Sequence, residues 1–256
     1  MVKWRFRWRN ASGQPDQADA VRPPPRVPEG TRVYAIGDIH GRADLLDRLH
    51  ALIEADFRAN PVSEVRLVYL GDYVDRGPDS AGVIERLITG PLIGEAKLLS
   101  GNHEQMLLHF LEDEASGVAW WQLGGLETLR SYGAIDGRMR PETGLAQELK
   151  SKLPAEHLTF IQGLEKTATF GDYFFCHAGV RPGVPLESQR EDDLLSIRGE
   201  FLSSTADFGK VVVHGHTPVA EPEFKSNRIN IDTGAYSTGR LTCLVLEGTE
   251  RRLLVT

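Results

Sequence analysis

An α/β fold is predicted by two features of the sequence. Short runs rich in β-branched and other apolar residues recur from residue 31 onward. Between the first three of these runs lie two segments in which apolar residues recur at helical spacing. Strands that are joined through crossover helices produce this alternation. We expect strands at residues 32–36, 66–70, 97–99, 172–176, 210–213, 228–231, 241–247 and 251–256.

The helices between the first three strands are predicted by apolar residues that recur every three or four positions. The first helix would carry Leu45, Leu46, Leu49, Leu52, Ile53 and Phe57, and the second would carry Val83, Ile84 and Leu87. Residues 104–165 contain several more helical patterns and no convincing strand. We therefore expect a helical insertion there, beside or above the edge of the sheet.

The first thirty residues differ from the rest of the chain. In residues 1–10, MVKWRFRWRN, apolar and cationic residues alternate, so a strand there would have one aromatic and one cationic face. Such a strip could dock on an acidic membrane or partner, but an extended tail or an added edge strand is the favoured interpretation. Residues 11–30 contain three consecutive prolines and have the composition of a linker, which leaves residues 31–256 as the globular domain.

Composition limits the functions that such a domain could perform. The 256 residues are 41% hydrophobic and 25% charged, and the formal net charge is −7. A negative chain lacks the broad basic surface that nucleic-acid binding requires, so no nucleic-acid partner is expected. No stretch of about 18 apolar residues is present, and no transmembrane segment is expected. Cys176 and Cys243 lie in apolar runs and are interpreted as buried thiols, so we predict a cytoplasmic protein.

Polar residues follow directly after five of the predicted strands. These junctions read AIGDIHG, YLGDYVDRG, LLSGNHE, FFCHAG and VVVHGHTP. The carboxyl ends of strands in an open α/β sheet form one edge, so groups that follow them can meet in one crevice. The sequence therefore predicts a single site built from segments that are far apart in the chain.

Six residues at these junctions are candidate metal ligands: Asp38, His40, Asp72, Asn102, His177 and His216. In isolation, each of these residue types is more often a turn residue, or a histidine with a structural hydrogen bond, than a metal ligand. Together they supply oxygen and nitrogen ligands without a thiolate, which suits two divalent metal ions, with Mn²⁺ first and Fe or Zn²⁺ as alternatives.

The same junctions resemble a known family. Residues 37–41 (GDIHG), 71–77 (GDYVDRG) and 101–104 (GNHE) are similar to three signature blocks of the phosphoprotein phosphatases within the calcineurin-like metallophosphoesterases. The resemblance extends through HAG, DLLSIR and HGHTP to about residue 240, and residues 121–133 are similar to a stretch in the bacterial branch. It implies a β-sandwich of mixed sheets flanked by helices.

The resemblance also implies a role for each site residue. Asp38, His40 and Asp72 would hold one metal ion; Asp72, Asn102, His177 and His216 would hold the other, so Asp72 would bridge them. His103 would be the general acid, with Asp75 orienting its imidazole. Arg76 and Arg198, with Asn102, would bind the phosphate, and a hydroxide held by the metal ions would attack it.

Three positions depart from the patterns of related sequences. Pro218 stands where many wider metallophosphoesterases have a further metal-binding histidine, which favours the phosphoprotein phosphatase branch. His214 is an alternative ligand, although His216 is preferred. Ser196 stands where a large aromatic residue is expected, which weakens the match that assigns Arg198. Trp120 and the adjacent Trp121 could line the substrate cleft, but one core contact and one surface contact is the more usual outcome.

Three functions compete at this stage. The leading one is hydrolysis of phosphoserine or phosphothreonine on proteins, because Asp75 and Glu104 match the protein phosphatases. The alternative is a symmetrical diadenosine tetraphosphate hydrolase or a broad-specificity phosphoesterase acting on small phosphoesters; the symmetrical hydrolases usually have Ala and Asp at those two positions. The third is an inactive metal-binding scaffold, for which a broken ligand set would be expected.

Overall fold

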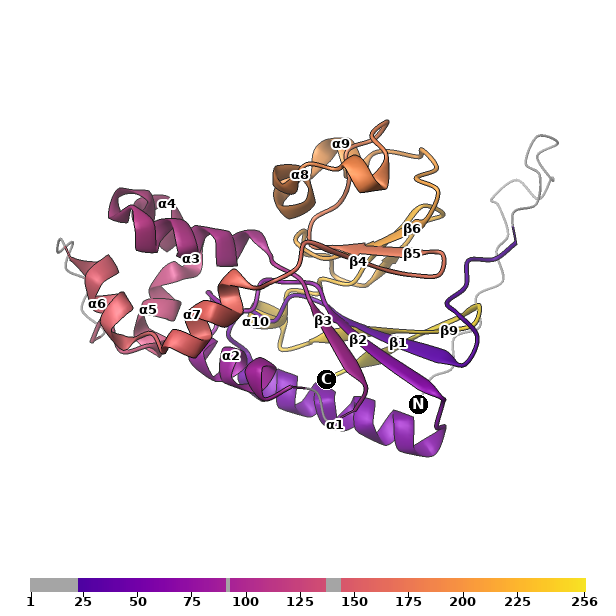
Figure 1. The fold of residues 1–256 in the computed structure, drawn as a ribbon, viewed down its shortest axis with the longest axis horizontal. Coiled ribbons are helices and arrows are strands. Elements are labelled where there is room, and N and C mark those ends of the chain that lie inside the picture. The colour runs from indigo at the N-terminus through magenta and orange to yellow at the C-terminus, as the bar shows by residue number, and fades with distance from the viewer. Residues whose placement is uncertain (1–22, 91–92, 137–143) are drawn as a thin grey trace.

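The computed structural model describes residues 23–90, 93–136 and 144–256. Two five-stranded sheets pack face to face, and helices cover their outer faces (Figure 1). This arrangement confirms the predicted α/β sandwich of mixed sheets flanked by helices. The strip predicted at residues 1–10 and most of the linker lie outside the described residues.

The first sheet has the strand order β10-β9-β1-β2-β3. Strands β1, β2 and β3 are parallel, and β9 and β10 extend the sheet in antiparallel fashion. All five strands were predicted, and each observed end lies within two residues of its predicted place. The bounds are β1 (Thr31–Ile36), β2 (Glu64–Tyr69), β3 (Glu95–Leu98), β9 (Thr242–Glu247) and β10 (Glu250–Val255).

The second sheet has the strand order β4-β5-β6-β8-β7. Strands β5, β6 and β8 are parallel and were predicted, whereas the antiparallel edge strands β4 and β7 were not. With four and two residues, the edge strands are too short to produce a recognisable alternation. The bounds are β4 (Thr167–Phe170), β5 (Tyr173–Cys176), β6 (Val211–His214), β7 (Glu223–Phe224) and β8 (Arg228–Asn230).

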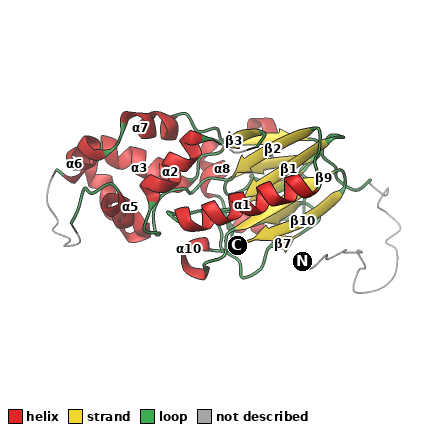
Figure 2. Cartoon of the chain, turned by 90° about the horizontal axis from the view of Figure 1, so that it is seen from below, coloured by secondary structure: helices red, strands yellow, loops and turns green. Residues whose placement is uncertain are grey.

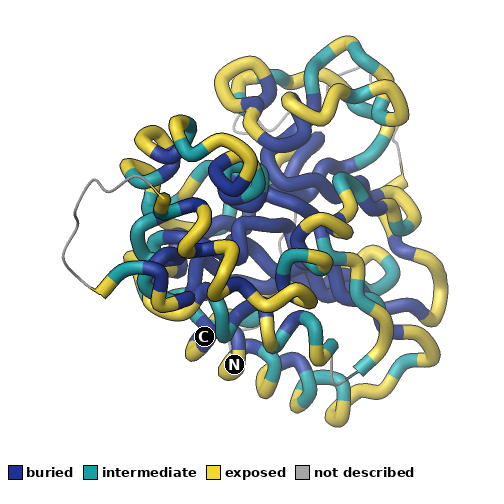
Figure 3. The backbone as a smooth tube through the Cα atoms, turned by 60° about the vertical axis from the view of Figure 1, so that its left-hand side comes forward, coloured by how far each residue is buried: buried dark blue, intermediate teal, exposed yellow. Residues whose placement is uncertain are grey.

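The core explains why the central strands read as continuous apolar runs. In β1, Val33 and Ala35 belong to the cluster between the two sheets, while Tyr34 and Ile36 belong to the cluster beneath the helices. Side chains alternate between the two faces of a strand, and here both faces are covered. Figure 3 shows that buried backbone runs through the centre of the molecule.

Helices α1 (Ala43–Ala59) and α2 (Ser80–Thr89) are the two predicted packing helices. Helix α1 lies across the outer face of the first sheet (Figure 2). Its buried face includes Leu45, Leu49 and Ile53, whereas Leu52 is exposed, contrary to the prediction. On the other side of the sandwich, the short helices α8 (Glu191–Ser196) and α9 (Gly199–Leu202) pack on the second sheet.

A group of helices connects β3 to β4 and lies beyond one end of the sheets (Figure 2). No strand is assigned to the described residues between 102 and 162, where a helical insertion was expected. A short 3-10 turn and a π-helical turn at Trp121–Gly125 join some of these helices. The helices are α3 (Asn102–Glu112), α4 (Gly117–Trp120), α5 (Leu126–Ser131), α6 (Leu145–Lys152) and α7 (Ala155–Gln162).

The two cysteines are free and buried, as predicted. Cys243 lies in the core cluster beneath α1, whereas Cys176 lies in the cluster beneath α8 and α9, on the opposite side of the sandwich. Among the described residues, no helix has the length and apolar character needed to cross a membrane.

Candidate metal centre

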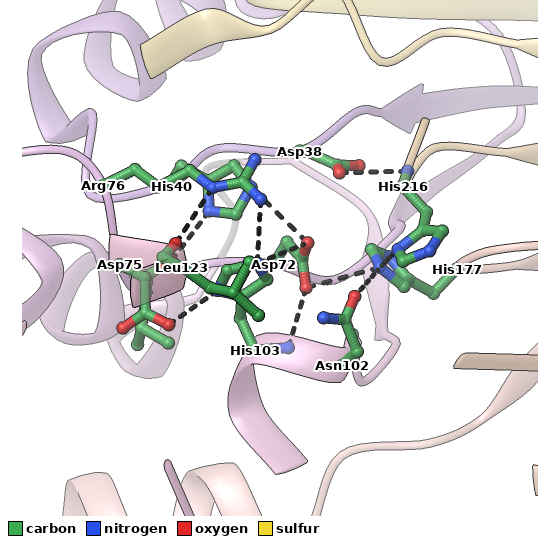
Figure 4. A network of polar contacts seen from close by, with 12 residues as sticks. Asp38, His40, Asp72, Asp75, Arg76, Asn102, His103, Leu123, His177 and His216 are labelled. Atoms are coloured by element: carbon green, nitrogen blue, oxygen red, sulfur yellow. Dashed lines mark hydrogen bonds and ion pairs between the residues drawn. The ribbon is translucent and has the colours of Figure 1, made fainter. Parts of the chain in front are cut away.

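The six predicted ligands lie together at the carboxyl ends of the strands (Figure 4). Strands β1, β2 and β3 of the first sheet lead into three of the junctions, and β5 and β6 of the second sheet lead into the other two. Because the central strands are parallel within each sheet, their ends converge in one place. The ligands are Asp38, His40, Asp72, Asn102, His177 and His216.

Asp72 occupies the middle of the site. Its Oδ2 lies 3.4 Å from His40 Nε2, and its Oδ1 lies 3.3 Å from His177 Nε2. Side chains that could hold a metal ion form two groups in this region, one with His40, Asp72 and His103 and the other with Asp72, His177 and His216. Since Asp72 belongs to both groups and turns one oxygen toward each, it is placed where a bridging carboxylate would be required.

Backbone carbonyls orient two of the histidines. His40 Nδ1 lies 2.9 Å from the carbonyl oxygen of Val74, and His177 Nδ1 lies 2.9 Å from that of Leu70. A carbonyl oxygen only accepts hydrogen bonds, so each Nδ1 carries the proton and each Nε2 is left to face the site. This is the arrangement by which surrounding groups fix the tautomer of a metal-ligating histidine.

Glycines allow the carboxylates to approach the backbone closely. A Cβ at Gly101 would overlap Asp72 Oδ1, and a Cβ at Gly215 would overlap Asp38 Oδ1. Asp38 Oδ2 accepts a hydrogen bond of 3.0 Å from the backbone N–H of His216, which joins the junctions after β1 and β6. The glycines of the sequence motifs are therefore required by the packing of the site itself.

The electrostatics of the site favour added positive charge. Burial, reinforced by Asp232, raises the pKa of Asp38 well above its usual range. Burial lowers the pKa of His177, but the charges of Asp72, Asp38 and Glu104 and the hydrogen bond with Asp72 together outweigh it and raise that pKa to about 10. Burial lowers the pKa of His40 to about 3, which keeps this imidazole neutral, as a metal ligand must be.

The donor set is consistent with a binuclear metal site. It consists of carboxylate, amide and imidazole groups without a thiolate, which suits Mn²⁺, Fe or Zn²⁺. Two of its buried atoms, Asp38 Oδ1 and His40 Nε2, have no hydrogen-bond partner. Buried polar atoms are normally satisfied, so these two atoms fit a ligand from outside the chain, such as a metal ion.

The backbone is strained at the site and nowhere else among the non-glycine residues that the structure describes. Five such residues have φ between +47° and +73°, the region that L-residues avoid. All five belong to the site: His40, Asp72, Asp75, Arg76 and His216. Strain of this kind persists only where the surrounding structure holds the residues in place.

His103 and Asp75 form a buried pair next to the metal ligands. His103 Nδ1 lies 2.6 Å from Asp75 Oδ2, and both side chains are almost completely buried. Burial would lower the pKa of His103, but the charge of Asp72 and the hydrogen bond with Asp75 raise it. A protonated imidazole beside a carboxylate has the properties that a general acid needs.

Two residues of the helical insertion hold Asp75, and neither contact was predicted from the sequence, which indicated Trp120 only as a cleft residue or a core contact. Trp120 Nε1 donates a hydrogen bond of 2.7 Å to Asp75 Oδ2, and Thr128 Oγ1 donates one of 2.5 Å to Asp75 Oδ1. Trp120 is buried and Trp121 is partly buried, so the former is the core contact. The insertion thus supplies part of the support for the acid pair.

We expect Trp120→Phe to lower kcat about tenfold, because it removes the indole donor to Asp75 while it keeps most of the packing; loss of a comparable supporting hydrogen bond typically costs 10–100-fold. The measurement is steady-state hydrolysis of an aryl phosphate by the metal-loaded protein. Trp121→Phe is the matched control, since Trp121 Nε1 has no hydrogen-bond partner. Equal rates for the two variants would contradict the assignment.

The two predicted phosphate-binding arginines both contact site histidines. Arg76 Nη2 lies 3.1 Å from His103 Nε2, and Arg198 Nε donates a hydrogen bond of 2.9 Å to His216 Nε2. The Arg76 backbone N–H donates to the carbonyl oxygen of Gly124, and its Nε donates to that of Leu123. Both guanidinium groups therefore lie at the metal centre, and the insertion holds one of them.

Two details differ from the expected ligand scheme, and one agrees with it. Asp38 belongs to neither group of close ligand atoms, whereas His103, expected only as an acid, belongs to the first. His214 belongs to neither group; its ring packs against Phe201, and its Nδ1 contacts the backbone oxygen of Gly215. The preference for His216 over His214 thus agrees with the geometry.

Two further acids near the site escaped the sequence-based assignment of roles. Glu104 is fully buried and accepts backbone N–H groups from Asp72, Tyr73, Val74 and Gly101 at 2.7 to 3.2 Å. It holds the loop after β2 in place through these backbone hydrogen bonds. Asp232 is also buried, and burial raises its pKa. Its position after β8 follows the strand-end rule, which could have revealed it.

Comparison with known proteins agrees with this geometry. The family described as calcineurin-like phosphoesterase matches residues 31–243. An asymmetrical bis(5'-nucleosyl)-tetraphosphatase PrpE of Anoxybacillus flavithermus is 27% identical over 230 residues, which cover 82% of this chain and 88% of the relative. The protein of the same name from Bacillus thuringiensis is 30% identical over 234 residues, with the same coverage of each chain.

A solved structure supports the fold independently. It covers 91% of this chain and 98% of its own, with a TM-score of 0.62 and 23% sequence identity. The structure is that of "a putative diadenosine tetraphosphatase". At this level of identity the likeness concerns the fold alone.

Proposed function

Because the chain belongs to the calcineurin-like phosphoesterase family, we propose that it is a two-metal hydrolase that cleaves bis(5'-nucleosyl) tetraphosphates asymmetrically. The observation that carries the proposal is the similarity to two PrpE relatives along most of both chains. These relatives favour the alternative drawn from the sequence over phosphoserine and phosphothreonine, but with asymmetrical instead of symmetrical cleavage. The products would be a nucleoside triphosphate and a nucleoside monophosphate.

The six ligands, with Asp72 in the middle, are proposed to hold two divalent cations, with Mn²⁺ as the first choice. When bound, such cations activate water and neutralise charge on the phosphoryl oxygens. A phosphate chain carries several negative charges. The cations that this site would bind, together with the two arginines, would supply positive charge to face them. The chemistry of the substrate and the charge of the site are thus complementary.

Arg76 and Arg198 are proposed to bind phosphate oxygens. Each now contacts a histidine nitrogen, but a phosphate oxygen is a stronger partner for a guanidinium group than a neutral imidazole is. Movement of Arg76 from His103 toward the phosphate would leave His103 Nε2 free to carry a proton. Substrate binding and the preparation of the acid would then be one event.

Hydrolysis of a protein phosphomonoester is the second candidate, and the His103–Asp75 pair is the observation that favours it. A serine or threonine alkoxide is strongly basic and must be protonated as it leaves. A nucleotide phosphate is a much weaker base and requires less assistance. A buried and well-supported acid is therefore most useful for the monoester reaction.

The test is hydrolysis by the purified, Mn²⁺-loaded protein of diadenosine tetraphosphate, of phosphoserine, phosphothreonine and phosphotyrosine peptides, and of p-nitrophenyl phosphate. We expect diadenosine tetraphosphate to give the highest kcat/KM, with ATP and AMP in equal amounts on anion-exchange chromatography. ADP as the main product would show symmetrical cleavage. Preference for a phosphopeptide would replace the proposal by the second candidate, and absence of any hydrolysis would refute both.

A further inference from the structure

We infer that Tyr236 and Leu123 form a binding surface for a nucleobase of the substrate, an inference that rests on the proposed function. Both side chains are large, apolar and exposed, and both residues contact the arginine that is proposed to bind phosphate. Neither residue was among those predicted from the sequence.

Tyr236 is held next to the metal centre. It lies on the short helix α10 (Ala235–Thr238), whose start is fixed by a hydrogen bond of 2.9 Å from the Gly234 N–H to Asp232 Oδ1. Arg42 Nη1 donates a further hydrogen bond of 3.0 Å to the carbonyl oxygen of Ala235. The tyrosine ring therefore has a defined position although 38% of the residue is exposed.

The surroundings of the Tyr236 ring place it beside the phosphate site. Its centroid lies 4.9 Å from Arg76 Cζ and 5.5 Å from the centroid of the His40 ring, which is nearly perpendicular to it. His40 is a candidate metal ligand, so the ring lies in the layer of residues that surrounds the metal centre. A group joined to a bound phosphate would pass close to this ring.

Leu123 approaches the same arginine from the helical insertion (Figure 4). Its backbone oxygen accepts a hydrogen bond of 3.3 Å from Arg76 Nε, and 45% of the residue is exposed. Gly124, the next residue, has φ +112°, and a Cβ there would collide with Arg76 Cγ. The turn is thus built to bring this segment against Arg76, and it leaves the leucine side chain in solvent.

The distribution of exposed apolar residues makes this pair unusual. Single exposed apolar side chains are common and need no explanation. Among the described residues, however, six large apolar residues are exposed: Leu52, Val118, Leu123, Tyr236, Leu253 and Val255. Two of the six contact one functional arginine. An aromatic ring over a phosphate-binding guanidinium group, with an exposed leucine whose backbone oxygen bonds the same group, matches the two parts of a nucleotide, a flat base and an anionic phosphate.

The experiment compares substrates with and without a base. For the full-length, Mn²⁺-loaded protein, we would measure kcat/KM for diadenosine tetraphosphate and for inorganic tripolyphosphate with wild type, Tyr236→Ala, Tyr236→Phe and Leu123→Ala. Leu253→Ala is the matched control, because Leu253 on β10 is equally exposed, at 37%. Equilibrium binding of AMP and of inorganic phosphate, measured by calorimetry, provides a readout that does not depend on catalysis.

We expect Tyr236→Ala to lower kcat/KM about tenfold more for the dinucleotide than for tripolyphosphate, and to weaken AMP binding about tenfold more than phosphate binding, within the range of base–aromatic stacking. Leu123→Ala should show the same selectivity with a smaller effect. Tyr236→Phe, which keeps the ring, should retain most of the wild-type preference.

Equal losses on both substrates would overturn the inference, because they would mean that Tyr236 only positions Arg76. Unchanged kinetics and binding in Tyr236→Ala would overturn it as well. The proposed function fails separately: if wild type does not cleave diadenosine tetraphosphate but Tyr236→Ala selectively weakens AMP binding, the nucleobase surface stands and the assigned reaction falls.

Discussion

Replacement of His103 by Asn should lower kcat by about 10²–10⁴-fold for substrates with a strongly basic leaving group. Asparagine keeps a hydrogen-bond donor near Asp75 but has no group in place of Nε2, so the proton source is lost while the buried carboxylate keeps a partner. The effect should be larger for phenyl phosphate than for p-nitrophenyl phosphate, and smallest for diadenosine tetraphosphate. Steady-state kinetics with this series measures the dependence on the leaving group.

His109→Asn is the control for the His103 variant. His109 lies on the same helix, α3, but is exposed and contacts no ligand of the metal centre among the residues that the structure describes. Its kinetics should match wild type. If His103→Asn slowed the hydrolysis of all substrates by the same factor, then His103 would not be the general acid. Its place beside His40 and Asp72 would then indicate a role as a metal ligand.

Replacement of Asp72 by Asn should remove metal binding and reduce activity on the order of 10³-fold or more, since several kcal/mol of charge stabilisation depend on the cations. Asn keeps the shape of the side chain but loses the charge that faces both ligand groups. The metal content per chain after gel filtration, measured by inductively coupled plasma mass spectrometry, should fall from about two ions to below one.

Asp113→Asn controls for the loss of one carboxylate. Asp113 is exposed at the end of α3 and accepts a hydrogen bond from the Ala115 N–H, outside the metal centre. Its metal content and activity should remain those of wild type. Retention of two tightly bound ions by Asp72→Asn would show that Asp72 does not bridge them, whatever its central position suggests.

The core of the site could be predicted because strand-end motifs combine two local signals. A β-branched run identifies the strand, and the Gly-Asp or Gly-Asn that follows identifies its carboxyl end, where parallel strands converge. Asp38, Asp72 and Asn102 were assigned in this way. The signal is present in each short segment and needs no knowledge of long-range contacts.

The support for the acid pair could not be predicted in the same way. Asp75 is held by Trp120 and Thr128, which are 45 and 53 residues away in the sequence. The resemblance of residues 121–133 to the bacterial branch marked the segment that contains Thr128 but assigned no role to either residue. A tryptophan that packs in a core and one that donates a critical hydrogen bond look identical in sequence. Only the packing of the insertion against the sheets distinguishes them.

Glu104 shows how a correct observation can lead to a weak inference. The residue was used to favour protein substrates over dinucleotides, but its carboxylate binds the backbone N–H groups of Asp72, Tyr73 and Gly101. A glutamate at position 104 is therefore explained by the structure of the loop after β2. On the inference that Tyr236 binds a nucleobase, substrate choice would reside in side chains that reach past the phosphate, and Tyr236 belongs to none of the family motifs in this sequence.

The five non-glycine residues with positive φ have a consequence for transplanting this site to another protein. Copying the side chains onto an ordinary scaffold would fail, because His40, Asp72 and His216 reach their positions through left-handed backbone that an unsupported loop would relax away from. A successful graft would have to copy the glycines and the buried Glu104 that impose those conformations. The conformation of the loops is therefore what has to be transferred, because the ligands take up their positions only when the loops have this backbone.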